Sequence, residues 1–325
     1  SAMAGLALLN HQKSVFLTAL ASLSSAWLCL ALRGRTEAFG ALVNEKAKQH
    51  PGQTRAARRI RELLEAEGYA PKAGQDVQTN SEHTEEMIQD RYSLRCAPQI
   101  LGPVLETLEL VERWLEVEVN GVSDNPLIDE DGRLGMGGNF YGGYLSQGMD
   151  YLKISLAQIA DLSDRQLTLL IDDKSNRGLP PNLANWPGLS QEERHLHHGL
   201  KGLHQAVNAI TSEIMPKALA NSIFSRSSES HNQDKVSLGM SAATQCHDML
   251  EDLFHVQSMY LICLAQALDL RGIQLKGEMS NFVYKLVRSV VPYVTADRAL
   301  DDSVDALSQE LQDLSLHFER KFPSL

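Results

Sequence analysis

Helical periodicity dominates the hydrophobic pattern of this chain. Apolar side chains recur three or four residues apart over five stretches: 55–67, 98–119, 145–171, 205–224 and 246–270. A further set has heptad-like steps of four and three residues: Leu300, Val304, Leu307, Leu311 and Leu314. Side chains at such spacings lie on one face of a helix, which then packs against other helices. The pattern predicts an all-α fold, an elongated bundle of long helices forming one domain over residues 1–325.

One apolar stretch is long enough to raise the question of a membrane. Residues 15–32 run without a charge, a length that suits either a membrane span or a buried helix. Thr18, Ser22, Ser25 and Cys29 follow one helical stripe, so one face is small and polar. We therefore expect a helix buried inside a large helical protein, and no membrane.

Three segments should interrupt the helices. Pro216 lies inside 205–224 and is expected to kink or split that helix. Residues 68–86 are polar without periodicity, which predicts a surface loop. Short strand candidates are confined to 135–144.

The charge balance argues against nucleic acid as a partner. The 325 residues hold 30 Lys and Arg against 41 Asp and Glu, a net charge of −11. Binding a phosphate backbone requires a basic face, and the basic cluster within 55–61 is followed directly by glutamates. The four cysteines are scattered without a Cys-x-x-Cys motif, which indicates a reduced, cytoplasmic setting. We interpret Ser1 and Ala2 as the remnant of a cleaved tag before a native Met3.

Two polar clusters hold residues suited to amino-acid chemistry. In QDRYSLRCAPQ (89–99), Arg95 offers a fork for a carboxylate and Tyr92 a phenol that can transfer a proton; a capped helix start is the alternative. In ESHNQD (229–234), Glu229 and the amides suit a substrate-facing loop; a surface capping loop is the alternative. Composition alone leaves both alternatives open.

A nucleotide loop and a metal site both lack their full motifs. In the glycine-rich segment 135–143, Phe140 stands where the third glycine of GxGxxG would be, so we expect a flexible turn or backbone packed close to a ligand. Four histidines lie close in sequence: His195, His197, His198 and His204. They form no HExxH motif, so we expect solvated surface histidines and no metal.

Several motifs occur in a shared order: QDRYSLRCAPQ (89–99), NGVSDNPLI (120–128), GGNFYGG (137–143), NRGLPP (176–181) and SESHNQDKVSLG (228–239), with GLALLN (5–10) and HPGQ (50–53) ahead of them. In this series the chain resembles the aromatic amino-acid and histidine ammonia-lyases and aminomutases over nearly its whole length. Its HNQD segment (231–234) is more similar to the phenylalanine and tyrosine branch.

The resemblance implies an electrophilic prosthetic group, 4-methylidene-imidazol-5-one (MIO), which the family makes by cyclising its own Ala-Ser-Gly. This chain contains no Ser-Gly dipeptide. In the family, that tripeptide, a mobile loop with a catalytic Tyr and the residues that choose the substrate side chain all precede the segment similar to GLALLN (5–10). We therefore expect only the carboxyl-terminal part of such a protein, with no cofactor of its own and MIO supplied by a partner chain that bears Ala-Ser-Gly.

The resemblance also implies roles for eight residues. Asn10 would lie beside the electrophile, and Tyr92 would help to orient it. Gln89 would bond to the electrophile or the substrate, and Phe140 would pack against the electrophile.

On the substrate side, Arg95 would pair with the carboxylate and Glu229 would approach the amine. Asn232 and Gln233 would complete the pocket. Three positions depart from the usual pattern and leave the detailed chemistry open: His11, Tyr141 and Lys235.

Sites in this family are built from several subunits, so the resemblance implies a homo-oligomer that acts on a small-molecule amino acid. Three functions stay open. The chain is a split or truncated ammonia-lyase or aminomutase for an aromatic amino acid, a non-catalytic binding or scaffold protein, or an enzyme that reuses the pocket without MIO.

Overall fold

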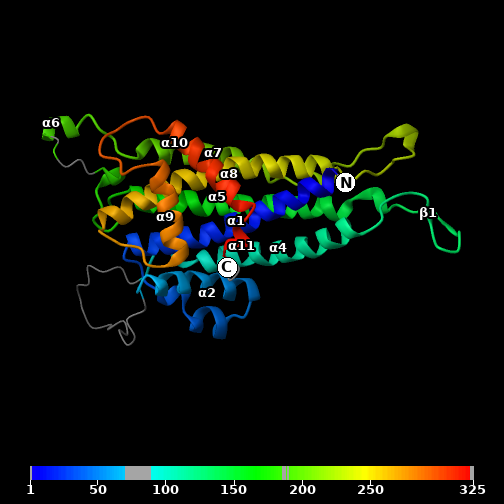
Figure 1. Ribbon diagram of the computed structural model, residues 1–325, viewed down its shortest axis with the longest axis horizontal. Helices are drawn as coiled ribbons and strands as arrows, with labels where there is room; N and C mark the ends of the chain where they lie inside the picture. The colour runs from blue at the N-terminus through cyan, green and yellow to red at the C-terminus, as the bar shows by residue number, and fades with distance from the viewer. Residues whose placement is uncertain (1, 70–88, 185–187, 189, 323–325) are drawn as a thin grey trace.

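The computed structural model describes residues 2–69, 89–184, 188 and 190–322. Five long helices make an elongated body (Figure 1): α1 (Ala2–Ala31), α4 (Ala97–Asn120), α5 (Gly143–Ile171), α7 (Lys201–Lys217) and α8 (Gly239–Leu270). Strand is limited, over these residues, to the antiparallel pair β1 (Leu127–Ile128) and β2 (Leu134–Gly135). The predicted all-α bundle of long helices is confirmed.

Shorter helices flank the long ones: α2 (Pro51–Ala66), α3 (Tyr92–Arg95), α6 (Gln191–Arg194), α9 (Glu278–Val290), α10 (Asp301–Ser315) and α11 (Phe318–Lys321). Helix α2 packs on α4, and α10 packs on α8. Three 3-10 turns lie in the loops discussed below: η3 (Asn139–Tyr141), η5 (Ser222–Phe224) and η6 (Glu229–His231).

The long helices give the body two distinct ends. Helices α1, α5 and α8 run in one direction, and α4 and α7 run against them (Figure 1). We call the hairpin end the one with the β1–β2 hairpin, the start of α5 and the loop over 222–238. We call the turn end the opposite one, with residues 89–96 and the start of α4.

Helix α1 runs through the centre of the core, and its residues 16–32 are buried. The hydroxyls of Ser14, Thr18, Ser22 and Ser25 each donate to the carbonyl four residues earlier, so the helix itself satisfies these four buried hydroxyls. By length and hydropathy α1 and α8 both suit a membrane, but 94% and 83% of their apolar windows are buried inside the body. The prediction of a buried helix over 15–32 is confirmed.

Two glycines let α2 approach α4 closely. A Cβ added to Gly52 would lie 2.1 Å from the Gly102 carbonyl oxygen, and one added to Gly102 would lie 2.6 Å from the Gln53 nitrogen. The Gly52 N–H donates to Glu106 Oε1 over 2.9 Å at this crossing. The HPGQ segment thus begins α2 and supplies its contact with α4.

The structure differs from the sequence pattern at α7 and α9. Helix α7 ends at Lys217 with Pro216 in its last turn, and η5 follows over Ser222–Phe224, so the stretch 205–224 is split after Pro216, one of the two outcomes predicted for it. The Leu219 carbonyl beyond it accepts from a buried side chain instead of continuing the helix. The pattern does not predict α9. Most of the loop expected over 68–86 lies outside the described residues.

Candidate active site

Asp90 ties the turn before α3 to two distant loops. Its carboxylate accepts from the Arg35 backbone N–H over 2.7 Å and from Arg177 Nη2 over 2.6 Å. Arg177 also donates through Nη1 to the Arg33 carbonyl over 2.6 Å. The NRGLPP segment (176–181) therefore holds the QDRY segment in place, although the two are far apart in the sequence.

A second anchor reaches the same turn from the core. Gln166 on α5 donates through Nε2 to Ser25 Oγ and to the Ser93 carbonyl, each over 2.9 Å. Its Oε1 accepts from the Tyr260 hydroxyl over 3.1 Å. Because the Gln166 amide is satisfied on both sides, the backbone between Tyr92 and Arg95 has a fixed position.

Tyr92 and Arg95 form a cation–π pair at the turn end. The guanidinium carbon lies 4.5 Å from the ring centroid, and Tyr92 is 71% exposed. Arg95 Nε is buried and has no hydrogen-bond partner among the described residues. Arg95 also lines a cavity of about 360 Å³ together with Gln89, Cys96 and Gln99. The guanidinium can therefore take an anionic ligand from this cavity.

Asn10 lies inside the body near the hairpin end. It is fully buried, and its Nδ2 donates to the Ala243 carbonyl over 2.8 Å. Its Oδ1 has no hydrogen-bond partner among the described residues. A buried acceptor without a partner costs free energy, so it marks a place where a donor belongs.

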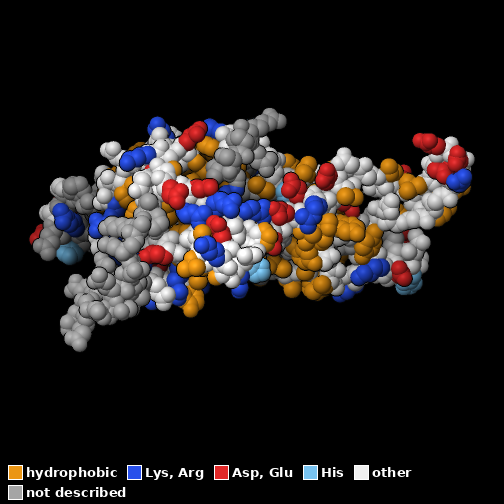
Figure 2. All heavy atoms as spheres, turned by 90° about the horizontal axis from the view of Figure 1, so that it is seen from below, with side chains coloured by type: hydrophobic (Ala, Val, Ile, Leu, Met, Phe, Trp, Pro, Cys, Tyr) orange, Lys and Arg blue, Asp and Glu red, His pale blue; other side chains and the backbone are white. Residues whose placement is uncertain are grey.

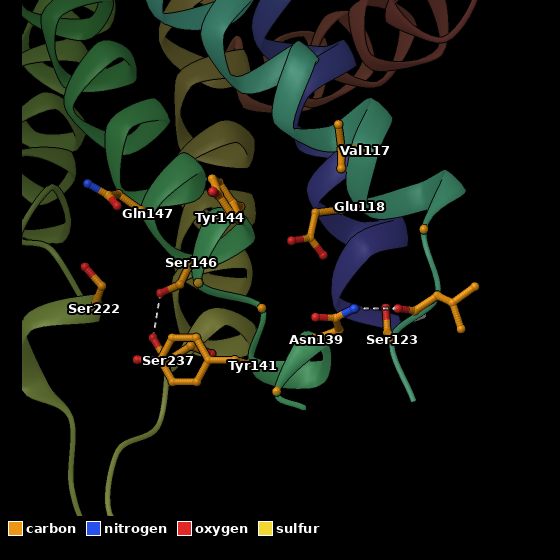
Figure 3. A pocket seen from close by; sticks show the side chains of 15 residues that line it. Val117, Glu118, Ser123, Asn139, Tyr141, Tyr144, Ser146, Gln147, Ser222 and Ser237 are labelled. Atoms are coloured by element: carbon orange, nitrogen blue, oxygen red, sulfur yellow. Dashed lines mark hydrogen bonds between the residues drawn. The ribbon is translucent and has the colours of Figure 1, made fainter. Parts of the chain in front are cut away.

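A cavity of about 720 Å³ opens beside Phe140 at the hairpin end, and Figure 3 shows its lining. Tyr141 and Ser237 lie on one side, and Glu118 and Asn139 lie on the other. Phe140 itself is 58% exposed. The glycines around it allow tight backbone packing: a Cβ on Gly142, which has φ of +67°, would meet the Met3 side chain at 2.3 Å.

Glu229 lies in the loop over 222–238, which projects from the hairpin end (Figure 1). Glu229, Ser230 and His231 are three consecutive residues with left-handed φ, at +49°, +50° and +69°. Asn232 Nδ2 donates to Glu229 Oε2 over 3.0 Å, and Gln233 pairs its backbone with Ser228. Strained backbone of this kind is typical of functional loops and persists only where its surroundings hold it.

The eight residues that the sequence singles out fall into two groups at opposite ends. Gln89, Tyr92 and Arg95 lie at the turn end, where Gln89 and Arg95 line one cavity and the Tyr92 ring packs against Arg95. The others lie at or near the hairpin end: Asn10, Phe140, Glu229, Asn232 and Gln233. Helix α4 alone, with 24 residues at 1.5 Å each, spans about 36 Å between the ends. One copy of the chain does not bring Arg95 near Glu229.

The chain matches the aromatic amino acid lyase family over residues 1–289. It belongs to that family. It is 35% identical over 320 residues to tyrosine ammonia-lyase of Cereibacter sphaeroides, a match that covers 96% of this chain and 60% of that relative. It is 33% identical to histidine ammonia-lyase of Geobacillus kaustophilus over 88% of this chain and 53% of that relative.

Solved structures of the aromatic amino acid lyase family share this fold. Phenylalanine aminomutase of Pantoea agglomerans superposes with a TM-score of 0.85 at 32% identity, over 96% of this chain and 61% of that one. Tyrosine aminomutase of Streptomyces globisporus superposes with a TM-score of 0.87 at 28% identity, over 98% and 61%. The chain spans about 60% of the length of these family members.

In this family member His195 and His198 are exposed, as expected, whereas His197 and His204 are partly buried and have hydrogen-bond partners. His204 Nε2 lies 3.1 Å from Thr168 Oγ1, and burial lowers its pKa despite the opposing charge of Asp164. His197 Nδ1 accepts from the Asp297 N–H over 3.1 Å. No group of three metal-ligating side chains occurs within the part of the chain that the structure describes.

The sequence pattern did not single out Asp150 and Lys153. Both lie on α5 and are buried, and their charges are 3.0 Å apart. A signal was present: an acid and a lysine lie three residues apart with apolar neighbours near the start of the 145–171 stretch. Charged groups are rarely buried unless they are paired, so such a spacing in a buried helix indicates an ion pair.

Proposed function

We propose that this chain supplies substrate-pocket walls of an ammonia-lyase or aminomutase for an aromatic amino acid. The observation that carries the proposal is the separation of Arg95 and Glu229 at opposite ends of one rod-shaped body. A site that uses both needs a second copy whose hairpin end meets the turn end of the first. The enzyme is accordingly a homo-oligomer with composite sites, as closed symmetric assembly favours.

Exposed apolar surface supports association at the hairpin end. Large hydrophobic side chains there are substantially exposed: Leu8, Leu9, Val117, Met136 and Phe140. Figure 2 shows hydrophobic side chains gathered on one face, toward the same end. Contiguous apolar surface of this kind marks interaction sites.

Within the composite site, Arg95 binds the substrate carboxylate through its forked N–H groups, held flat against Tyr92. Glu229 approaches the substrate amine and handles its proton, with Asn232 fixing its carboxylate orientation. Gln89 and Gln233 add amide donors and acceptors around the substrate. The names of the relatives, which cover tyrosine, phenylalanine and histidine, support an aromatic amino acid as substrate.

The residues present fit an MIO group. The buried Asn10 amide is not fully paired among the residues that the structure describes, and the exposed Phe140 ring offers a packing face near the same end of the body. When bound, MIO supplies an electrophile that activates the amine of the substrate. No Ser-Gly dipeptide occurs in these 325 residues, so the proposal takes the group from an Ala-Ser-Gly segment outside them, such as one on a partner chain. Four cysteines free of disulfides support the expected cytoplasmic location.

Co-expression tests the proposal directly. The chain is produced with and without an amino-terminal family segment that carries Ala-Ser-Gly, and complexes are identified by native mass spectrometry. Turnover of tyrosine, phenylalanine and histidine is followed by absorbance of the unsaturated acid and by chromatography of the β-amino acid. We expect turnover only from the complex. A stable complex without turnover of any of the three would overturn the proposal.

A further inference from the structure

A fully buried lysine lies in α5 below the hairpin end. Lys153 Nζ donates to the Leu219 carbonyl and to Gln245 Oε1, each over 2.7 Å, and to Asn221 Oδ1. Asp150 Oδ1 lies 3.0 Å away. The three N–H groups of the ammonium are therefore all used, and its charge is paired.

Asp150 binds the same turn through its backbone. One carboxylate oxygen accepts from the Asn221 N–H and the other from the Ser222 N–H, each over 2.9 Å. Burial by itself raises the pKa of Asp150, but the N–H groups of Ser222 and Asn221 and the Lys153 ammonium outweigh it and lower that pKa. The carboxylate is thus held charged in the interior.

These contacts all converge on the entry to the Glu229 loop. The turn over 219–222 leads from α7 into the loop over 222–238. Four backbone or side-chain groups of that turn bind the Asp150–Lys153 pair. The pair therefore fixes the position of the segment that enters the loop.

The segment that leaves the loop, at residues 236–238, is held by the same helix. Ser146 on α5 donates through Oγ to the Ser237 carbonyl over 2.6 Å, as Figure 3 shows. The Val236 N–H donates to Ser225 Oγ over 3.0 Å and closes the neck of the loop. Helix α5 thus anchors both the entering and the leaving segment at the base of the Glu229 loop.

Stability alone does not explain a buried ion pair at this place. The desolvation of two buried charges often offsets their attraction, and an apolar pair of similar volume is often as stable. A charged pair does, however, bind several backbone groups in one fixed geometry. The loop tip needs such a base, because Glu229, Ser230 and His231 hold strained left-handed backbone.

We propose that Asp150 and Lys153 are positioning residues that set the place of Glu229 by clamping the base of its loop to α5. The inference rests on the proposed function for the role of Glu229, but the clamp itself is a property of this chain alone. Neither residue touches the cavity beside Phe140, so the pair acts through the loop.

Hydrogen exchange of the full chain tests the clamp without any activity. The variants are Lys153→Met and the charge-balanced Lys153→Met/Asp150→Asn, which avoids an uncompensated buried carboxylate if the single variant fails to fold. The matched control is Lys13→Met, since Lys13 also binds a carboxylate and an amide, Glu251 at 2.8 Å and Gln312 at 3.1 Å, away from the loop.

We expect amides over 219–238 to exchange at least about 10-fold faster in the folded clamp variants, while peptides over 89–99 keep their wild-type rates. The control should leave both segments unchanged. Wild-type exchange over 219–238 in a folded variant that lacks Lys153 would overturn the clamp.

Kinetics of the active complex then test the positioning of Glu229. Lys153→Met should lower kcat/KM by roughly 10- to 100-fold with most of the loss in kcat, and it should add little to a Glu229→Gln background. Fully additive losses would overturn the positioning role. If the wild-type complex turns over nothing, the proposed function fails, while hydrogen exchange still decides on the clamp.

Discussion

Arg177 Nη2 lies 2.6 Å from Asp90 Oδ1, and this ion pair joins the loop after α5 to the turn before α3. Asp90 is only 6% exposed and Arg177 is 26% exposed. Arg177 holds left-handed backbone, with φ of +55°, in order to reach the carboxylate and the Arg33 carbonyl together. The Tyr92–Arg95 turn is therefore positioned by a residue more than 80 positions away in the sequence.

Removing that arginine should loosen the turn end. Arg177→Met leaves the Asp90 carboxylate buried without its cation, so we expect a loss of about 2 kcal/mol, less than for a fully buried pair because Arg177 is partly hydrated. Urea unfolding measures this loss. As a control, Arg133→Met removes exposed pairs with Asp129 and Asp131 and should change stability by less than about 0.5 kcal/mol. Equal effects of the two variants would contradict the assigned role of Arg177.

The α2–α4 crossing should not tolerate a methyl group. A Cβ on Gly52 would lie 2.1 Å from the Gly102 oxygen, which is backbone and cannot move aside alone. We expect Gly52→Ala to destabilise the chain by about 3 kcal/mol. Gly5→Ala on α1, where nothing lies within 4 Å of the added atom, should stabilise by about 0.5–1 kcal/mol. Thermal unfolding of both variants compares them, and a tolerated Gly52→Ala would refute the close crossing.

The folding stability of the chain should fall as the pH is lowered, and His204 should contribute to this fall. Burial lowers the pKa of His204 below its ordinary value of 6.5, so the unfolded chain binds this proton more readily than the folded chain. The contribution is present above pH 6.5 and is lost as the pH falls below it. His204→Gln should flatten the stability curve between pH 5 and 7 in urea titrations. As a control, His195→Gln, at an exposed histidine, should keep the wild-type slope of stability against pH. An unchanged slope in His204→Gln would contradict the prediction.

The cysteines should differ sharply in reactivity. Burial raises the pKa of Cys246 to about 12 and raises the pKa values of Cys29 and Cys263 further, so thiolate is scarce at these sites. Cys96 is half-buried at the cavity that Arg95 lines. Iodoacetamide at pH 8 should modify Cys96 first in the folded chain, as peptide mass spectrometry reports. Rapid labelling of Cys246 without unfolding would contradict its burial.

Composite sites predict complementation between inactive variants. Arg95→Ala and Glu229→Gln should each lower turnover of the complex by about 100-fold or more, to a residual rate that can still be measured. Mixed in equal amounts, they should recover roughly a quarter of the activity, because a site that needs Arg95 from one copy and Glu229 from another is intact in that fraction of random assemblies. Size-exclusion chromatography confirms mixing. No recovery in mixed oligomers would place both residues in a site from a single copy.

The sequence alone determined most of the long helices and the family. Spacings of three and four residues predict α4, α5, α8 and α10 because burial of one helical face is a local, periodic demand. It also placed the polar clusters around Arg95 and Glu229 at the ends of helices. The end of α7 was not predictable in this way, because side chains of α5, distant in sequence, capture the backbone after Leu219.

Only the tertiary structure decided how the candidate residues group. Arg95 and Glu229 lie at opposite ends because Arg95 precedes α4 and Glu229 follows α7, and both helices run from the turn end to the hairpin end. The direction of each helix is set by long-range packing. The same packing pairs Asp90 with Arg177 and buries Lys153 beneath the Glu229 loop. Such contacts join residues dozens of positions apart, so no local pattern encodes them. They are what divides the candidate site between the two ends of the molecule.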